Sequence, residues 1–331
     1  MMVHDLLRRF APANITPALA TLLCLVAVPT LMAAKEWDDH DRSEKTLARA
    51  TAINFLESCE PNAILFTEGD NDTYPLWYLQ EVEGIRNDVR IINISLLGID
   101  WYIDQLRYAI NKAAPVNLIW TPESYRGEKR NYITYEAGLN IDPNRYYDLT
   151  EALTIAGAES QNNRDSRGNI SMPTRKMRLP VDSNYLRKNY PNGLVVKADT
   201  QTRLVSAIDF EIMPNGVAYK NDWAILNIVA ANAWKRPIYF ANSIDPGHYE
   251  GLEQYLRMEG LAYKLVPEFT PGSNMNQPLN VNTKKCTDLI MNTYQFGNAH
   301  KGHIHFDQTN RRMLNSPRVM GVQLCEALLR E

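Results

Sequence analysis

Residues 15–34 of this 331-residue chain contain no charged side chain and form an unbroken apolar stretch. A helix needs about 20 such residues to cross a hydrocarbon layer of roughly 30 Å, so this stretch predicts a membrane span. Arg8 and Arg9 precede it, and acidic residues follow it. Because positive charge is retained on the cytoplasmic side, we expect the rest of the chain to lie outside the cytoplasm. A cleavable signal peptide ending near Ala33 and Ala34 would have the same orientation.

The remainder of the chain has the composition of a globular protein. Hydrophobic residues make up 45% of the sequence and charged residues 22%, which is enough for a substantial core. The formal net charge is −3, so no basic excess can neutralise a phosphate backbone, and we expect no nucleic-acid partner. The four cysteines lack the CxxC spacing of a metal site. Cys59 and Cys286 are either buried thiols, which we favour, or a disulfide pair.

Strand-like and helix-like segments alternate along the chain after residue 60. Apolar or β-branched runs predict strands at residues 62–67, 88–97, 116–120 and 236–244. Helical periodicity predicts helices at residues 73–83, 100–113 and 221–234. Such alternation implies parallel strands joined by right-handed crossovers. We therefore predict an α/β fold: a mainly parallel Rossmann-like sheet with flanking helices, one N-terminal transmembrane helix and a C-terminal helical pair. The predicted units are residues 1–35 with the transmembrane helix, residues 36–270 as the α/β domain, and residues 271–331 as the C-terminal helical region.

The first predicted strand is followed by an acidic turn, Glu68-Gly69-Asp70-Asn71-Asp72-Thr73. The simplest interpretation is structural: Gly69 permits a sharp turn, and Asn71 or Asp72 caps the next helix. The same side chains could instead bind a polar ligand. An Asp-X-Asp pattern is also typical of sites for Mg²⁺ or Mn²⁺, which prefer carboxylate oxygens. We favour the structural interpretation, followed by the polar ligand, and we expect neither a metal ion nor a cofactor.

The position of this turn makes it the best candidate for a binding site. In an open parallel sheet, ligands bind in the crevice beyond the carboxyl ends of the strands. Trp77 on the following helix could stack on a sugar, although aromatic residues at helical spacing are more often core residues. Arg236 could contact an anion. No motif assigns a catalytic residue, and the candidate ligand-binding residues are Glu68, Gly69, Asp70, Asn71, Asp72, Thr73, Trp77, Asp100, Trp101 and Arg236.

Three segments carry a resemblance to a known family. They are NAILFTEGDNDTYPLWYLQEVEGIRNDVRIINISLLGIDWYIDQL (residues 62–106), NDWAILNIVAANAWKRPIYFA (221–241) and GLEQYLRMEGLAYKLVP (251–267). In this order they resemble the C-terminal extracytoplasmic region of a family of large, polytopic membrane proteins of Gram-negative bacteria. That family is of unknown function and is related to protein O-mannosyltransferases. The resemblance extends from about Trp37 to the end of the chain.

The resemblance implies a location and a role. Proteins of this family carry many N-terminal membrane helices, resemble GT-C transferases that use lipid-phosphosugars, and hold a soluble periplasmic domain behind the last span. This chain has one apolar span, so we expect it to be the accessory tail of such a protein, without the catalytic membrane part or sugar transfer. The expected location is the inner membrane, with the soluble domain in the periplasm, where it binds an acceptor protein or glycan. The alternative is a membrane-anchored binding or scaffold module without a catalytic role.

Overall fold

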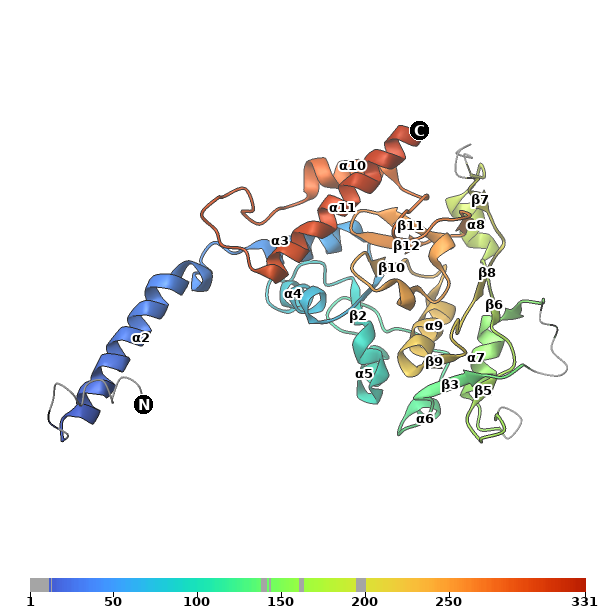
Figure 1. Cartoon of the computed structure of the whole chain (residues 1–331). Coiled ribbons are helices and arrows are strands. Elements are labelled where there is room, and N and C mark those ends of the chain that lie inside the picture. The colour runs from blue at the N-terminus through green and yellow to red at the C-terminus, as the bar shows by residue number, and fades with distance from the viewer. Residues whose placement is uncertain (1–11, 13, 138–141, 143, 161–163, 195–200) are drawn as a thin grey trace.

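The computed structural model describes residues 12, 14–137, 142, 144–160, 164–194 and 201–331. Helix α2 (Thr16–His40) contains most of the apolar stretch and projects away from the folded body (Figure 1). Its segment Thr16–Trp37 has the length and composition of a membrane span, and none of its apolar window is buried within the structure. A membrane span and a signal sequence share these properties, so both predicted roles of the stretch fit the helix.

A five-stranded sheet forms the centre of the body, in the order β11-β12-β10-β1-β2. Its strands are β1 (Ile64–Thr67), β2 (Arg90–Asn93), β10 (Ile238–Ala241), β11 (Leu256–Glu259) and β12 (Ala262–Leu265). β1 lies between β10 and β2 and is parallel to both, with Ile64 aligned with Ile238 and with Arg90. All three strands are buried along their length. The sequence-based prediction that these three strands are parallel, buried neighbours is confirmed.

The predicted fold class is wrong, because the central sheet is mixed and smaller sheets that include antiparallel strands accompany it. β12 runs antiparallel to β10, and β11 runs antiparallel to β12. Gly260 and Leu261 form the two-residue turn between β11 and β12, and Gly260 has a φ of 76°, which glycine adopts without strain. The sheet is therefore not a mainly parallel Rossmann-like sheet. Only its three strands β10, β1 and β2 follow that arrangement.

The run 116–120, predicted as a third strand, is not a strand. The backbone N–H of Asn117 donates to the side chain of Asn232, and that of Trp120 donates to the side chain of Asn227. Both acceptors lie on α9 (Lys220–Asn232). The backbone polar groups of this run thus have partners on a helix, and β10 is the second parallel neighbour of β1.

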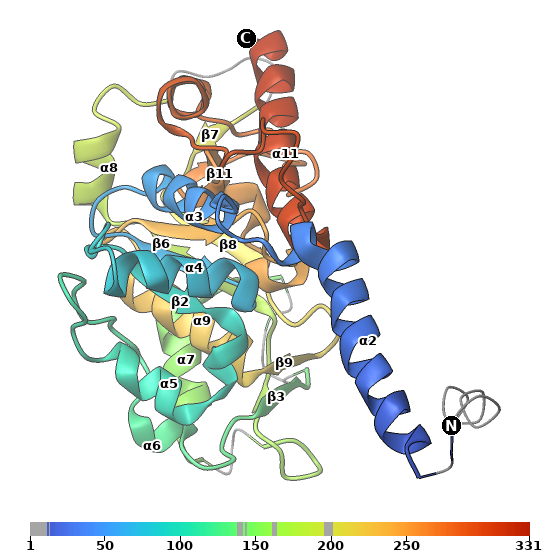
Figure 2. The ribbon, with the colours of Figure 1, turned by 90° about the vertical axis from the view of Figure 1, so that its left-hand side faces the viewer.

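Helices cover both faces of the central sheet. α4 (Asp70–Glu81) packs against β2 and against α3 (Leu47–Ser58), and the 3₁₀ helix η1 (Ile94–Gly98) packs against α5 (Asp100–Leu106) and α9. Figures 1 and 2 show α3 and α4 on one side of the sheet and α9 on the other. α9 is buried around most of its circumference, as expected for a helix with apolar residues on nearly every side. It packs against α7 (Leu149–Gly157).

The predicted C-terminal helical pair is present. α10 (Thr283–Asp288) continues into a π-helical turn, η5 (Leu289–Thr293), and the second long helix is α11 (Gln308–Arg330). α11 packs against both α10 and α3, and α10 packs against β11. The predicted unit boundaries after residues 35 and 270 stay predictions.

Smaller elements complete the body at the end opposite to α2 (Figure 1). In the described residues they form sheets of the order β5-β3-β9, β4-β6-β8 and β13-β7. The strands are β3 (Tyr132–Tyr135), β4 (Tyr147–Asp148), β5 (Ser171–Met172), β6 (Lys176–Pro180), β7 (Arg203–Leu204), β8 (Ala207–Glu211), β9 (Val217–Tyr219) and β13 (Glu268–Phe269). The remaining helical segments are α6 (Pro122–Tyr125), α8 (Ser183–Asn189), η3 (Pro246–Tyr249) and η4 (Glu253–Tyr255).

Candidate functional site

Three segments meet at the carboxyl ends of β1 and β10. β1 is followed by Glu68 and the acidic turn, and β10 is followed by the loop 242–250. Because α9 leads into β10 and runs back along the sheet, its first turn, which holds Asp222, lies at this same end. We call the group formed by Glu68, Asp222, His248 and Glu250 the carboxyl-edge cluster.

His248 lies between two carboxylates of this cluster. Its Nε2 is 3.5 Å from Oε1 of Glu68, and its Nδ1 is 3.6 Å from Oδ1 of Asp222. The other oxygen of Glu68 accepts a hydrogen bond of 2.7 Å from the backbone N–H of Asp245. The contact with Asp222 raises the pKa of His248, burial opposes this, and the charge of Glu68 raises the pKa further. The cluster therefore favours a positive charge at the position of the imidazole.

Glu250 is the most buried member of the cluster, with an exposed fraction of 9%. Its Oε1 has no hydrogen-bond partner. Burial raises the pKa of Glu250 well above its ordinary range, and the nearby carboxylate of Asp222 raises it further. In the part of the chain that the structure describes, no lysine or arginine forms an ion pair with Asp222 or with Glu250. Asp222, His248 and Glu250 offer ligand atoms that all lie within 4.8 Å of one another, so these three residues could hold a metal ion.

The acidic turn is built only partly as the sequence predicts. Gly69 has a φ of 72° and supports the sharp turn. The predicted cap by Asn71 or Asp72 is wrong, because α4 begins at Asp70 and its N-cap is Gly69, which has no side chain to accept a capping hydrogen bond. Asp72 instead accepts a hydrogen bond from Oγ of Ser243, in the loop after β10. Burial raises the pKa of Asp72 despite the opposing hydrogen bond from Ser243, and Glu68 raises it further.

The other side chains of this turn differ in exposure and in their contacts. Asp70 and Asn71 are exposed, and Asp70 interacts with Tyr74 on the same helix. Thr73 is buried, and its Oγ1 lies 2.8 Å from Oγ1 of Thr67 at the end of β1. The two carboxylates of the Asp-X-Asp pattern thus have different surroundings, one beside Tyr74 and one bonded to the neighbouring loop.

A groove lies beside the edge strand β2, next to α4 and α5. Its volume is about 340 Å³, and Trp77 of α4 and Trp101 of α5 both line it. Trp101 has 59% of its surface exposed. Polar side chains also line the groove: Gln80, Glu81, Asn87, Gln105 and Asn111. The two tryptophans that the sequence analysis selected are therefore brought to one groove, which we call the tryptophan groove.

Comparison with known families identifies the family to which most of the chain belongs. The sequence profile of the TMEM260-associated domain 2 matches residues 48–285, well over half of the 331 residues. The chain belongs to this family. TMEM260 proteins form a protein O-mannosyltransferase-like family, which agrees with the resemblance to that class of membrane protein. Neither a curated protein nor a solved structure matches the chain.

The TMEM260-associated domain contains both the carboxyl-edge cluster and the tryptophan groove, while α2 and α11 lie outside the matched range. The remaining predicted residues lie elsewhere in the domain. Asp100 forms a 2.7 Å ion pair with Lys220 and accepts a hydrogen bond from the backbone of Gly127. Arg236 precedes β10 and donates to the backbone carbonyls of Asn62, Ala114 and Pro115. The ten predicted residues therefore do not form one site, because Arg236 lies at the amino end of β10.

Most of the carboxyl-edge cluster lies outside the residues that the sequence pattern predicts for a site. Asp222, His248 and Glu250 come from a helix start and a loop that are distant in sequence from the acidic turn. One feature of the sequence points to the loop 242–250: it follows a predicted parallel strand, and ligands often bind at the carboxyl ends of such strands. The same rule that selected Glu68 therefore selects His248 and Glu250 once β10 is placed beside β1.

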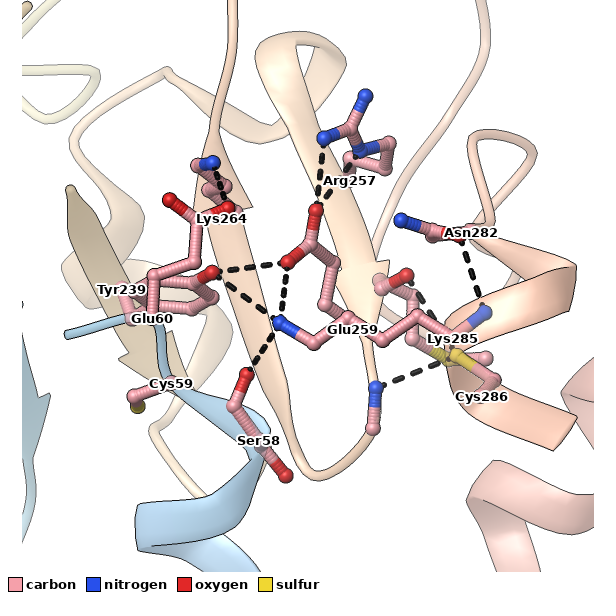
Figure 3. A network of polar contacts seen from close by, with 12 residues as sticks. Ser58, Cys59, Glu60, Tyr239, Arg257, Glu259, Lys264, Asn282, Lys285 and Cys286 are labelled. Atoms are coloured by element: carbon pink, nitrogen blue, oxygen red, sulfur yellow. Dashed lines mark hydrogen bonds and ion pairs between the residues drawn. The ribbon is translucent and has the colours of Figure 1, made fainter. Parts of the chain in front are cut away.

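A second group of buried charges ties α10 to the sheet (Figure 3). Glu259 of β11 lies 2.7 Å from both Arg257 and Lys285, and the hydroxyl of Tyr239 donates to it at 2.8 Å. Burial opposes ionisation of Glu259, yet the charges of Arg257, Lys285 and Lys264 lower its pKa to about 2. Figure 3 also shows Cys59 and Cys286 at this network, and both are buried free thiols. We call this group the Glu259 network and interpret it as structural.

Proposed function

We propose that this chain is an extracytoplasmic accessory domain of a glycosyltransferase-related membrane protein, and that it binds a glycan in the tryptophan groove. The glycan is either free or carried by an acceptor protein. α2 tethers the domain to the inner membrane, and the body lies in the periplasm. The observation that carries the proposal is the pair of tryptophans, Trp77 and Trp101, beside one groove.

The chemistry of the tryptophan groove suits a sugar. An indole ring offers a flat apolar face for the C–H face of a sugar ring and one N–H donor at its edge. The amide side chains of Asn87, Gln105 and Asn111 can both donate and accept hydrogen bonds, as sugar hydroxyls do. The groove volume of about 340 Å³ falls within the range of small-ligand sites, about 300–1,000 Å³.

The family supports the biological setting of this proposal. TMEM260 proteins are protein O-mannosyltransferase-like, so mannosides are the first glycans to test. α2 is long and apolar enough for a membrane anchor, and the chain before it carries Arg8 and Arg9, which favour a cytoplasmic N-terminus. A domain held at the membrane in this way would meet its ligand close to the lipid surface.

The proposal is tested by titrating the purified full chain, in detergent micelles, with methyl mannoside and mannose oligosaccharides. Binding is measured by calorimetry and by the change in tryptophan fluorescence. We expect Trp77→Ala and Trp101→Ala each to weaken the affinity about tenfold, which corresponds to about 1.4 kcal/mol. A transfer assay with polyprenyl-phosphate sugars should show no turnover by the chain alone.

Tyr78→Ala is the matched control, because Tyr78 follows Trp77 on α4, is 49% exposed and does not line the groove. This variant should bind mannosides as the unmodified chain does. Absence of glycan binding, or binding that survives both tryptophan substitutions, would contradict the proposal and favour a scaffold role. Sugar transfer by the chain alone would show that the domain is catalytic rather than accessory.

A further inference from the structure

The carboxyl-edge cluster contains a group of three side chains whose geometry suits a metal ion. Asp222 Oδ1 and His248 Nδ1 lie 3.6 Å apart, and a ligand atom of Glu250 lies within 4.8 Å of both. Two ligands bound at about 2.1 Å to one tetrahedral ion lie roughly 3.4 Å apart. Asp222 and His248 are therefore already close to the spacing of two ligands on one ion, and Glu250 lies near enough to complete the site by a shift of its side chain.

Two buried polar atoms of this group have no hydrogen-bond partner. Oε1 of Glu250 is buried without a hydrogen bond, in a side chain that is more than nine-tenths buried. Nδ1 of His248 is also buried without a hydrogen bond, since 3.6 Å is too long for one. A buried carboxylate that faces another carboxylate is costly unless a cation or a shared proton lies between them. An ion at this position would satisfy the oxygen and the nitrogen together.

The surroundings of the three side chains resemble the outer shell of a metal site. A metal-bound imidazole commonly directs its other nitrogen to a carboxylate, which fixes the ring. Nε2 of His248 lies 3.5 Å from Glu68, and Glu68 is itself held by the backbone N–H of Asp245. On the other side, Oδ2 of Asp222 accepts a 2.8 Å hydrogen bond from the backbone N–H of Tyr219. Two of the three candidate ligands are thus held in place by groups outside the site.

We propose that Asp222, His248 and Glu250 bind one divalent transition-metal ion, of the Zn²⁺ or Mn²⁺ class. Two carboxylate oxygens and one imidazole nitrogen are a ligand set that these ions accept. Three protein ligands leave at least one coordination position for water or a ligand oxygen. The ion-binding site does not depend on glycan binding in the tryptophan groove, which involves different residues. It also differs from the Asp-X-Asp pattern, because Asp70 is exposed and lies beside Tyr74.

The experiment is calorimetric titration of the full chain in detergent micelles with ZnCl₂ and with MnCl₂, after removal of metals with EDTA. We expect one ion to bind per chain. His248→Ala and Glu250→Gln should each weaken the affinity at least tenfold. Glu68→Gln, which removes only the charge that positions His248, should weaken it about tenfold. Co²⁺ added in place of Zn²⁺ should give a visible absorption band that disappears in His248→Ala.

His303→Ala is the matched control, because His303 is 69% exposed in its side chain and contacts Glu44 far along the chain from the cluster. It should bind the ion with unchanged affinity. Glu250→Gln is nearly isosteric, and circular dichroism of each variant will show that it is folded. Absence of binding by the unmodified chain would overturn the proposal and favour a proton shared by Asp222 and Glu250. Binding that survives both His248→Ala and Glu250→Gln, or that is lost in His303→Ala, would also overturn it.

Discussion

Glu250 and Glu259 are both buried glutamates of the same domain, yet their surroundings are opposite in charge. Glu259 is 1% exposed and lies between Arg257 and Lys285, with the hydroxyl of Tyr239 completing its hydrogen bonds (Figure 3). Glu250 is 9% exposed and faces Asp222, with one oxygen unbonded. Burial disfavours the charged form of both side chains, but only at Glu259 do opposite charges outweigh it.

This difference separates a structural site from a candidate functional one. The Glu259 network neutralises its own charge within the protein and joins α10 to β11 and β10. The carboxyl-edge cluster leaves buried polar atoms unmatched, and it lies at strand ends where α/β proteins bind ligands. Strongly shifted pKa values occur at both places, so the shift alone does not identify function. What distinguishes Glu250 from Glu259 is that its pKa shift comes from burial and from like charge.

The largest expected effect comes from breaking the Glu259 network. Glu259→Gln leaves Arg257 and Lys285 without their shared counter-charge, and removing one partner of a buried ion pair costs about 3–5 kcal/mol. We expect a loss of this size in the free energy of unfolding, measured by urea denaturation of the full chain in detergent micelles. The control is Asp209→Asn, which breaks the exposed pair with Arg178. That change should cost less than about 1 kcal/mol. Equal losses in the two variants would show that the Glu259 network is not structurally special.

Acid should weaken the same network by a slightly smaller amount. The pKa of Glu259 is lowered in the folded state from 4.5 to about 2, so the folded protein binds this proton more weakly than the unfolded chain. The resulting stability is present above about pH 4.5 and is lost as the pH falls toward 2, by about 3 kcal/mol in total. Unfolding curves at pH 7, 4 and 3 measure it. Glu259→Gln should have a flatter pH dependence in this range, and a profile identical to that of the unmodified chain would contradict the assignment.

The two regions also differ in how far the sequence predicts them. Short apolar runs predict β1, β2 and β10 because each strand carries its own local pattern. In β11, Arg257 and Glu259 alternate with Leu256 and Met258, a pattern typical of a strand with one face in water. α10 packs against β11, and no local pattern in the sequence of the strand predicts this contact. The antiparallel hairpin and the smaller sheets depend on such distant contacts, and for this reason the predicted fold class is wrong.

The carboxyl-edge cluster shows the same limit at the level of single residues. Glu68 is a candidate because it follows a predicted strand, whereas Asp222 lies in the first turn of α9, where an acidic residue is usual for structural reasons alone. Only the pairing of β1 with β10 brings Asp222, His248 and Glu68 into contact. Trp77 and Trp101 differ from these residues, because they lie on helices that flank one predicted strand, although the sequence did not predict the groove that they line.

The smallest expected effect comes from the substitution at Glu250 that matches Glu259→Gln. In the metal-free protein, Glu250 has no lysine or arginine partner among the described residues to lose, and a neutral amide avoids the cost of a buried charge beside Asp222. Glu250→Gln should therefore leave the free energy of unfolding in EDTA unchanged or slightly increased. The same glutamate-to-glutamine change thus gives opposite results at two buried positions.

Added Zn²⁺ sharpens this comparison, because an ion that binds only the folded state raises stability by an amount that grows with the logarithm of the ion concentration divided by its dissociation constant. The unmodified chain should gain stability when Zn²⁺ replaces EDTA, and Glu250→Gln should gain little, while Glu259→Gln should keep the full gain on its lower baseline. Urea denaturation of the three proteins in both conditions measures all of these differences. A loss for Glu250→Gln in EDTA as large as that for Glu259→Gln would mean that Glu250 is an ionised, paired carboxylate. The contrast between the two glutamates, and the argument for an ion between Asp222 and Glu250, would then fail together.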